Sequence, residues 1–307
     1  MPKKIKKIPK KFHISYPLTA VILIIIASFI VIFLGNLEKP SVETGKKLIP
    51  DPLIARYSPP GVEPLIARRS GFKIIGNITS GFYSIHVPIL LYHYVEINKD
   101  LGDTIRHSLT VSPYWFKEQA KYLVENNYTT ITIEDLAYAL EGRKDLPLKP
   151  VILTFDDGYR DFYTDVYPIL KKYNLKATNF VFPNVLDKKN NMDTWMVKEI
   201  SNSGLVTIGS HTLSHAYLSK LQQSLAQKEI FESKIVLEQI IEKPVNVFAY
   251  PYGAFDKAAV ELVQKAGFVA AVSTIKGNNQ SLNSLFNLSR IRVGNFAGEQ
   301  FKKLLEE

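Results

Sequence analysis

Cysteine is missing from this sequence of 307 residues. Without cysteine the chain has no disulfide, no thiolate metal site, no cysteine nucleophile and no lipid-linked thiol. Its absence leaves the redox compartment open. With 46% hydrophobic residues the chain can bury a full core, so we expect one large domain with additional segments.

A basic stripe of the kind that binds nucleic acid is also missing. The formal net charge is +9, and lysines within the first eleven residues supply six of these charges, which leaves +3 for the rest. These lysines are Lys3, Lys4, Lys6, Lys7, Lys10 and Lys11. No later segment interleaves basic and aromatic residues, so we expect no nucleic-acid partner.

Charge is absent from one stretch near the N-terminus. Residues 18–34, LTAVILIIIASFIVIFL, are at the short end of what spans a bilayer. Lysines before this stretch predict a transmembrane signal anchor over 18–35, with residues 1–17 as a cytoplasmic tail and the remainder outside the cytoplasm. The alternative is a cleaved signal peptide, although no small-x-small cleavage site occurs near Gly35 and Asn36.

The rest of the chain predicts a spacer and an α/β domain. Residues 36–84 are proline-rich and predict a semi-rigid extracytoplasmic spacer, with a strand or two over 70–86. In the domain over 85–307, predicted strands cover 87–93, 128–133, 151–155, 177–182, 205–210, 245–250, 268–274 and 288–293. Predicted helices cover 113–126, 134–141, 160–173, 195–203, 220–242, 256–266 and 298–306. This alternation predicts a parallel sheet, open or closed into a barrel, and eight strands favour the barrel.

Two adjacent aspartates follow one predicted strand. In VILTFDDGYRDF (151–162) the apolar residues indicate a buried strand, and Gly158 opens a turn before a helical pattern. Adjacent carboxylates repel each other, and the pKa of one rises unless a cation absorbs the charge. Asp156 and Asp157 therefore indicate a metal, a proton-transfer role or both. The alternative is structural, with Asp157 opening the turn and Asp156 capping the next helix.

Two histidines four residues apart form the second motif, GSHTLSHAYL (209–218). On a helical turn both rings, those of His211 and His215, would lie on one face, which suits a divalent cation. The spacing alone is weak evidence, because it also occurs by accident or for structural reasons. It lacks the glutamate of H-E-x-x-H metalloproteases. The Asp156–Asp157 pair can supply the missing carboxylate.

The third motif, FAYPYGAF (248–255), ends a strand in a tight turn. Taken alone it reads as an ordinary strand-to-helix turn, although its aromatic edges and freed N–H groups would suit a sugar groove. Its position changes this interpretation. The aspartate pair, His211, Tyr252 and His93 each follow a predicted parallel strand, and the carboxyl ends of such strands share one edge.

Together, TFDDG, HTLSH and YPYG resemble the NodB-type polysaccharide deacetylases, carbohydrate esterase family 4, over about residues 86–295. The resemblance implies a distorted (β/α) barrel that deacetylates N-acetylglucosamine polymers with a divalent metal, usually zinc, with cobalt, nickel or iron as alternatives. It implies that the metal ligands are Asp157, His211 and His215. It also implies that Asp156 is the general base and that the Tyr252 N–H helps to hold the oxyanion.

The sequence departs from the family pattern in two places. Many members carry a base-orienting arginine two residues before the proline of the third motif, where this chain has Ala249. Many also carry a late histidine as the acid, whereas no histidine follows His215 here, and the late segment LSRIRV offers Arg290 and Arg292 instead. The chain is more similar to the poly-N-acetylglucosamine deacetylase subgroup, in which the acid comes from an early strand. This similarity points to His93, for which strand-end packing is the alternative.

The remaining candidates concern the substrate. We expect Trp195, Tyr250, Pro251 and Tyr252 to contact sugar, although core packing would explain each aromatic ring equally well, and we assign His86 and His107 to loop or structural roles. The expected partners are an N-acetylglucosamine polysaccharide and the membrane. Two alternatives are an inactive glycan-binding domain of the same fold and a hydrolase of a non-glycan amide.

Overall fold

The computed structural model describes residues 74–77, 82–100 and 102–307. The expected tail (1–17), the anchor (18–35) and most of the spacer (36–84) lie outside these residues, so those assignments stay predictions. Among the described residues, no helix combines the length and the apolar character that a membrane crossing requires.

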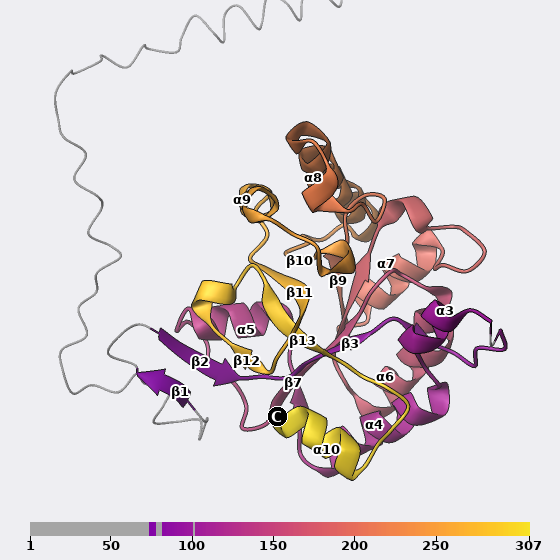
Figure 1. The fold of residues 1–307 in the computed structure, drawn as a ribbon. Helices are drawn as coiled ribbons and strands as arrows, with labels where there is room; N and C mark the ends of the chain where they lie inside the picture. Colours follow the sequence, from indigo (N-terminus) through magenta and orange to yellow (C-terminus); the bar gives the residue numbers. More distant parts are fainter. Residues whose placement is uncertain (1–73, 78–81, 101) are drawn as a thin grey trace, which may run out of the picture. The chain divides into compact units, whose positions relative to one another are not determined.

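Seven parallel strands close into a barrel (Figure 1). Around the ring they run β3, β13, β11, β10, β9, β8 and β7, and β3 pairs with β7 to close it. Their bounds are β3 Ile89–Tyr92, β7 Pro150–Phe155, β8 Ala177–Val181, β9 Val206–Ser210, β10 Val247–Ala249, β11 Ala270–Lys276 and β13 Leu288–Arg292. Because every pairing in the ring is parallel, all seven carboxyl ends meet at one rim. The predicted parallel barrel is confirmed.

The eighth predicted strand, at 128–133, does not join the ring. β6 (Thr129–Thr130) pairs with the first two residues of β7, and β3 pairs with the rest of the same edge. The chain leaves β6 early because Thr132 and Asp135 form a capping box that starts α5 (Ile133–Leu140). The expectation of eight barrel strands is therefore wrong by one.

Each of the seven predicted helical runs has a counterpart with ends within three residues of those expected. One of them is α5, and another begins as a π-helical turn, η3 (Phe162–Val166), which continues directly into α6. α6 covers Tyr167–Tyr173, and the others are α4 Pro113–Glu125, α7 Thr194–Asn202, α8 Gln223–Ile241, α9 Lys257–Lys265 and α10 Glu299–Glu306. As the sequence predicts, Ser112 caps α4, where its side chain accepts a hydrogen bond from the N–H of Trp115.

The core has an outer and an inner part because strand side chains alternate between two faces. Side chains such as Leu153 and Phe248 pack outward against the helices. Side chains such as Ile152 and Phe180 point the other way, and their cluster continues onto α5. At Gly209 a Cβ would lie 2.4 Å from the Phe180 ring, so this position in the barrel leaves room for glycine alone.

Two small sheets complete the described fold. β1 (Ile74–Asn77) and β2 (Phe82–His86) form an antiparallel pair that β12 (Asn279–Gln280) extends. This pair confirms the strands expected over 70–86.

The chain makes an excursion directly after β3. There β4 (Tyr94–Val95) pairs with β5 (Thr110–Val111), and the segment between them contains α3 (Thr104–Leu109), which buries no side chain. Sequence reasoning missed β4, β5 and α3 because elements of two to six residues are too short to show a period.

Candidate active site

The side chains of the three motifs lie at the rim where the barrel strands end. Asp156 and Asp157 follow β7, His211 follows β9, and the turn that holds Tyr252 follows β10. His93 directly follows β3. In barrels of parallel strands this end is where catalytic sites form, because side chains from several strands converge there.

Arg290 binds Asp156 from β13, which is separated from β7 by β3. Nη1 donates to Oδ1 and Nη2 to Oδ2, both at 2.8 Å. The arginine is buried, and it also donates to the carbonyl of Ser273 at 2.8 Å and to the Thr154 hydroxyl at 3.1 Å. Burial alone would raise the pKa of Asp156, but the charge and hydrogen bonds of Arg290, together with His211 and His93, outweigh burial and lower it. Asp156 is therefore ionised at neutral pH. The arginine missing at Ala249 is thus supplied by a different strand.

Asp157, His211 and His215 form a group that could hold a metal ion. One potential ligand atom from each lies within 4.8 Å of the other two. The Nε2 atoms of His211 and His215 lie 3.4 Å and 3.1 Å from the same Asp157 oxygen, Oδ1. That oxygen is buried, and it makes no hydrogen bond of acceptable geometry within the described residues. Three donors that converge without hydrogen bonding to one another fit a divalent cation with an open position for water.

The charges of this group support the same interpretation. Burial by itself would raise the pKa of Asp157, but His211, His215 and His93 hold it well below its usual range. Burial by itself would lower the pKa of His211, but the neighbouring carboxylates raise it. The buried carboxylate therefore depends on a nearby positive charge, which a bound cation would also supply.

The two histidines lie on an irregular turn, so the expectation of a helical turn is wrong. Thr212 and His215 have φ of 63° and 62°, which no right-handed helix contains. Glu229 of α8 holds the turn, because its carboxylate accepts from the N–H groups of Leu213 and Ser214, both at 2.9 Å. The sequence carries no local signal for this contact across fifteen residues or more.

Each metal-site histidine has a partner on its other ring nitrogen. Nδ1 of His211 lies 2.8 Å from the carbonyl of Ala249, and Nδ1 of His215 lies 3.1 Å from the Tyr252 hydroxyl. Such partners fix the tautomer and the orientation of a ligating imidazole. The Tyr252 ring in turn stacks on Tyr217, with centroids 5.3 Å apart.

The third motif separates two tyrosines that we expected to act together. Tyr250 is fully buried against Phe248 and Phe255, and Pro251 is buried as well, so neither is placed to contact a sugar. That part of the expected substrate set is wrong, because strand alternation turns Tyr250 into the outer core. Tyr252 is 61% exposed and lies on the rim.

The Tyr252 turn has an unusual backbone. Tyr252 has φ 60°, and Asp157 has φ 77°. Backbone strain of this kind costs about 1–3 kcal/mol per residue and clusters at functional sites. The next residue, Gly253, also has positive φ, and a Cβ there would lie 1.9 Å from the Thr274 hydroxyl oxygen. The turn is therefore packed tightly against β11, which fixes the direction of the Tyr252 N–H.

The charged groups of this rim shift the pKa of His93. Burial lowers its pKa, Asp156 and Asp157 oppose that shift, and Arg290 adds to it, as does Arg292. The net effect lowers the pKa, so the imidazole is neutral at neutral pH. Among the described residues it has no hydrogen-bond partner, which leaves both ring nitrogens available. Its acid role stays a prediction.

The other candidates divide between surface and structure. Trp195 is 55% exposed at the start of α7 and packs edge-on against Tyr163. His86 ends β2 and its Nε2 lies 2.8 Å from the Leu305 carbonyl, which is a structural role. His107 lies in α3 rather than in a loop.

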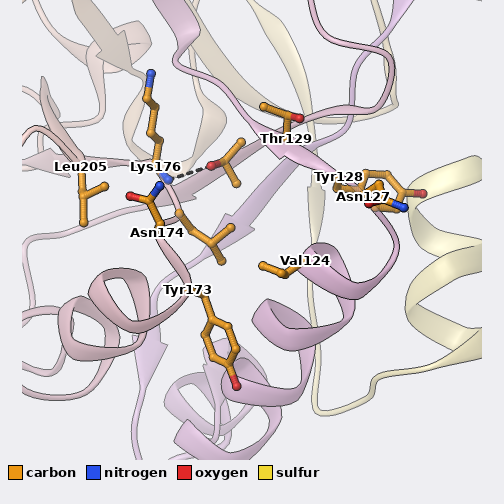
Figure 2. Close-up of a pocket in the computed structure, with 10 residues that line it drawn as sticks. Val124, Asn127, Tyr128, Thr129, Tyr173, Asn174, Lys176 and Leu205 are labelled. Atoms are coloured by element: carbon orange, nitrogen blue, oxygen red, sulfur yellow. Dashed lines mark hydrogen bonds between the residues drawn. The ribbon is translucent and has the colours of Figure 1, made fainter.

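A cavity of about 480 Å³ lies at the opposite end of the barrel (Figure 2). Lys176 and Leu205 line it just before β8 and β9 begin, next to Tyr173 and Val124 from the ends of α6 and α4. Within the lining, the backbone N–H of Lys176 donates a hydrogen bond of 2.7 Å to the Thr130 hydroxyl, drawn as a dashed line in Figure 2. No carboxylate or histidine lines this cavity, so it does not compete with the rim as a catalytic site.

A parallel barrel with an Asp-His-His group and a second buried carboxylate at its carboxyl rim defines a hydrolase of the NodB type. The polysaccharide deacetylase family pattern matches residues 143–271. YxkH of Bacillus subtilis (strain 168), named as a polysaccharide deacetylase, is 31% identical over 221 residues, which cover 72% of this chain and 76% of YxkH. The chain belongs to the polysaccharide deacetylase family.

Two further similarities help to place the chain within that family. The poly-β-1,6-N-acetyl-D-glucosamine N-deacetylase of Escherichia coli (strain K12) is 27% identical over 222 residues, covering 58% of this chain and 33% of that protein. The chain thus spans about a third of this longer relative. The structure of the Streptococcus pyogenes deacetylase PplD in complex with acetate is 29% identical, with a TM-score of 0.68, and the match covers 72% of this chain and 98% of PplD.

Proposed function

We propose that this protein hydrolyses the N-acetyl amide of N-acetylglucosamine units in a cell-surface or extracellular polysaccharide. One observation carries the proposal: three side chains that could hold a metal ion converge beside Asp156, a carboxylate that Arg290 fixes with two hydrogen bonds. Family membership supports the reaction class, and the name of the Escherichia coli relative supports the sugar.

Asp156 would be the general base. Two hydrogen bonds from Arg290 fix its carboxylate, and its lowered pKa keeps it ready to accept a proton from the attacking water. Asp157, His211 and His215 would hold a divalent cation, zinc first and cobalt, nickel or iron as alternatives. When bound, such a cation supplies Lewis acidity and makes water more acidic.

Two further groups would act on the acetamide. The Tyr252 N–H is an early N–H of a 3-10 turn and has no partner within that turn, so it would donate to the acyl oxygen as negative charge develops there. The sugar amine leaves as a protonated group, and His93 would donate that proton. Because its pKa is lowered, His93 would first take up a proton from solvent and pass it to the departing amine, while the proton that Asp156 takes from the attacking water would return to solvent.

The alternative of an inactive glycan-binding domain is less consistent with the site. Such a domain would need neither the base nor the complete ligand set, yet Asp156, Asp157 and both histidines converge on the rim. No observation favours a non-glycan amide over a glycan.

Metal binding and acetate release from purified protein test the proposal. Chelation should abolish acetate release from N-acetylglucosamine oligomers, and zinc or cobalt should restore it. Asp157→Ala, His211→Ala and His215→Ala should lose both bound metal and activity. Asp156→Asn should keep the metal and lose most turnover, because it removes the base and not a ligand.

The exposed Asp145→Asn is the matched control and should change neither quantity. Loss of metal from the Asp156 variant, with retention by the Asp157 variant, would reverse the two roles. A metal-loaded parent that releases no acetate from any of these oligomers would refute the proposed function.

We also propose that the catalytic domain lies outside the cytoplasm on a membrane anchor over 18–35. The lysine-rich segment before the uncharged run supports this orientation. In intact cells, added protease should degrade the C-terminal domain and spare a tag at the N-terminus. Protection of the domain would contradict the orientation.

A further inference from the structure

A second pocket, of about 260 Å³, is lined in part by Tyr159, Arg160 and Asp161, which closely follow Asp157 in the sequence. Its walls come from the excursion after β3, from the start of the helix that follows the aspartate pair, and from the loop before α7. The lining residues that matter here are Tyr94, Glu96, Arg106, Tyr159, Asp161 and Asn190. None of them lies within TFDDG, HTLSH or YPYG.

Tyr159 is a shared wall between this pocket and the metal site. It follows Asp157 by two residues, at the start of the segment that leads from the end of β7 into the pocket wall. The Tyr159 ring stacks on Tyr94, with centroids 3.9 Å apart, and the Tyr159 hydroxyl accepts a hydrogen bond of 2.6 Å from the Tyr94 hydroxyl. A polymer whose acetamide reaches Asp157 would therefore continue over Tyr159 into the pocket.

The charges of the pocket argue against an anionic ligand. Glu96 neutralises Arg106 through two hydrogen bonds, at 2.5 Å and 2.7 Å. Asp193 neutralises Arg160 in the same way, at 2.6 Å and 3.0 Å. Both arginines are therefore paired, and among the described residues the one other cation that lines the pocket, the exposed Lys189, is outnumbered by two carboxylates without an ion pair, Asp161 and Asp165. The paired groups instead offer fixed acceptors and donors of the kind that sugar hydroxyls use.

Asp161 supplies an acceptor that the protein itself does not use. Its Oδ2 accepts from the Val95 N–H at 2.7 Å, whereas Oδ1 is buried and has no hydrogen-bond partner among the described residues. Leaving a buried acceptor unpaired costs about 1–3 kcal/mol, more for a charged group. Burial, together with the nearby charges of Glu96 and Asp165, raises the pKa of Asp161 to about 7. A hydrogen-bond donor from a ligand would satisfy Oδ1 and offset the cost of burying it.

We propose that this pocket is a second glycan subsite, which binds the hexosamine unit next to the one being deacetylated, with Asp161 accepting a hydrogen bond from that unit. The inference rests on the proposed function for the identity of the polymer. Its volume lies below the roughly 300–1,000 Å³ of pockets for drug-sized ligands, which suits one sugar ring.

The experiment measures binding and turnover of N-acetylglucosamine oligomers, from the monosaccharide to the pentasaccharide. For the parent, affinity and kcat/KM should rise at the length that first fills the pocket. Asp161→Asn keeps an oxygen for the Val95 N–H but puts an NH₂ donor in place of the acceptor oxygen Oδ1. It should bind the longer oligomers about tenfold or more weakly, through KM, and bind the monosaccharide as the parent does.

Asn190→Ala is the second variant, because this exposed side chain reaches the pocket from the opposite wall and makes no hydrogen bond among the described residues. It should reduce the rise in affinity and in kcat/KM at the oligomer length that first fills the pocket. Lys188→Ala, exposed in the same loop but outside the pocket, is the matched control. Equal affinity of both pocket variants and the parent for every oligomer would overturn the subsite. Calorimetric binding decides this even if the parent releases no acetate, an outcome that would refute the proposed function separately.

Discussion

Replacing Arg290 by methionine tests whether Arg290 takes the place of the arginine that the third motif lacks, by binding Asp156. Arg290→Met keeps most of the apolar length of the side chain and removes the charge and all four hydrogen bonds. It leaves Asp156 ionised and buried, with the carbonyl of Ser273 and the Thr154 hydroxyl each losing a donor. The change therefore separates the effect of the charge from simple loss of volume.

The structure sets the size of the effect. Removing one partner of a buried ion pair costs about 3–5 kcal/mol, because the remaining charge stays uncompensated. For a domain of this size, 1 kcal/mol corresponds to roughly 2–4 °C in Tm, so we expect a loss of about 6–20 °C. Arg292→Met, on the same strand but exposed, should stay within about 0.5 kcal/mol of the parent.

Activity should change in a direction that misfolding alone cannot produce. Arg290 lowers the pKa of Asp156, so its removal raises that pKa. A general base has to be deprotonated, and the acidic limb of the pH–rate profile should therefore move to higher pH in Arg290→Met. Thermal unfolding and the pH dependence of acetate release measure the two effects. An unchanged acidic limb together with a stability within about 1 kcal/mol of the parent would refute the reasoning.

Three shorter predictions concern other residues of the rim. His93→Asn should keep fold and metal, lose about 10²–10⁴-fold in turnover and lose the alkaline limb of its pH–rate profile; turnover within threefold of the parent would contradict the acid role. Tyr252→Phe should weaken metal affinity about 10–100-fold in a chelator competition, whereas Tyr217→Phe, which keeps the stacking, should not. The raised pKa of Asp161 means that the folded state binds its proton more tightly than the unfolded state, so the parent should lose stability as pH rises from about 4 to about 7. Asp161→Asn should lose less stability over that range in denaturant titrations, and equal slopes would contradict the prediction.

Much of the fold could be predicted because its helices and strands are specified by residues that are close together in the sequence. The apolar run before Asp156 and the capped start of α4 depend on residues a few positions apart, so period and cap are visible in the sequence. The gathering of Asp157, His211 and His215 was predictable for a related reason. Parallel strands bring their carboxyl ends to one rim, so residues that follow different strands become neighbours.

The rest depended on contacts between distant segments. The capping box of α5 ends β6 locally, but the pairing of β3 with the rest of that edge of β7 was decided by packing between distant segments. The outward turn of Tyr250 and the exposure of Tyr252 depended on which face of β10 meets the helices. No period or cap reports such choices, because they are made by packing between parts of the chain that are far apart in sequence.

The sequence by itself thus determined the barrel, its rim and the residue types that reach it. Tertiary structure alone decided that Arg290 holds Asp156 across 134 positions, that Glu229 shapes the histidine turn, and that Asp161 keeps one oxygen free. The physical reason is that hydrogen bonding acts over about 3 Å in space, whatever the separation along the chain.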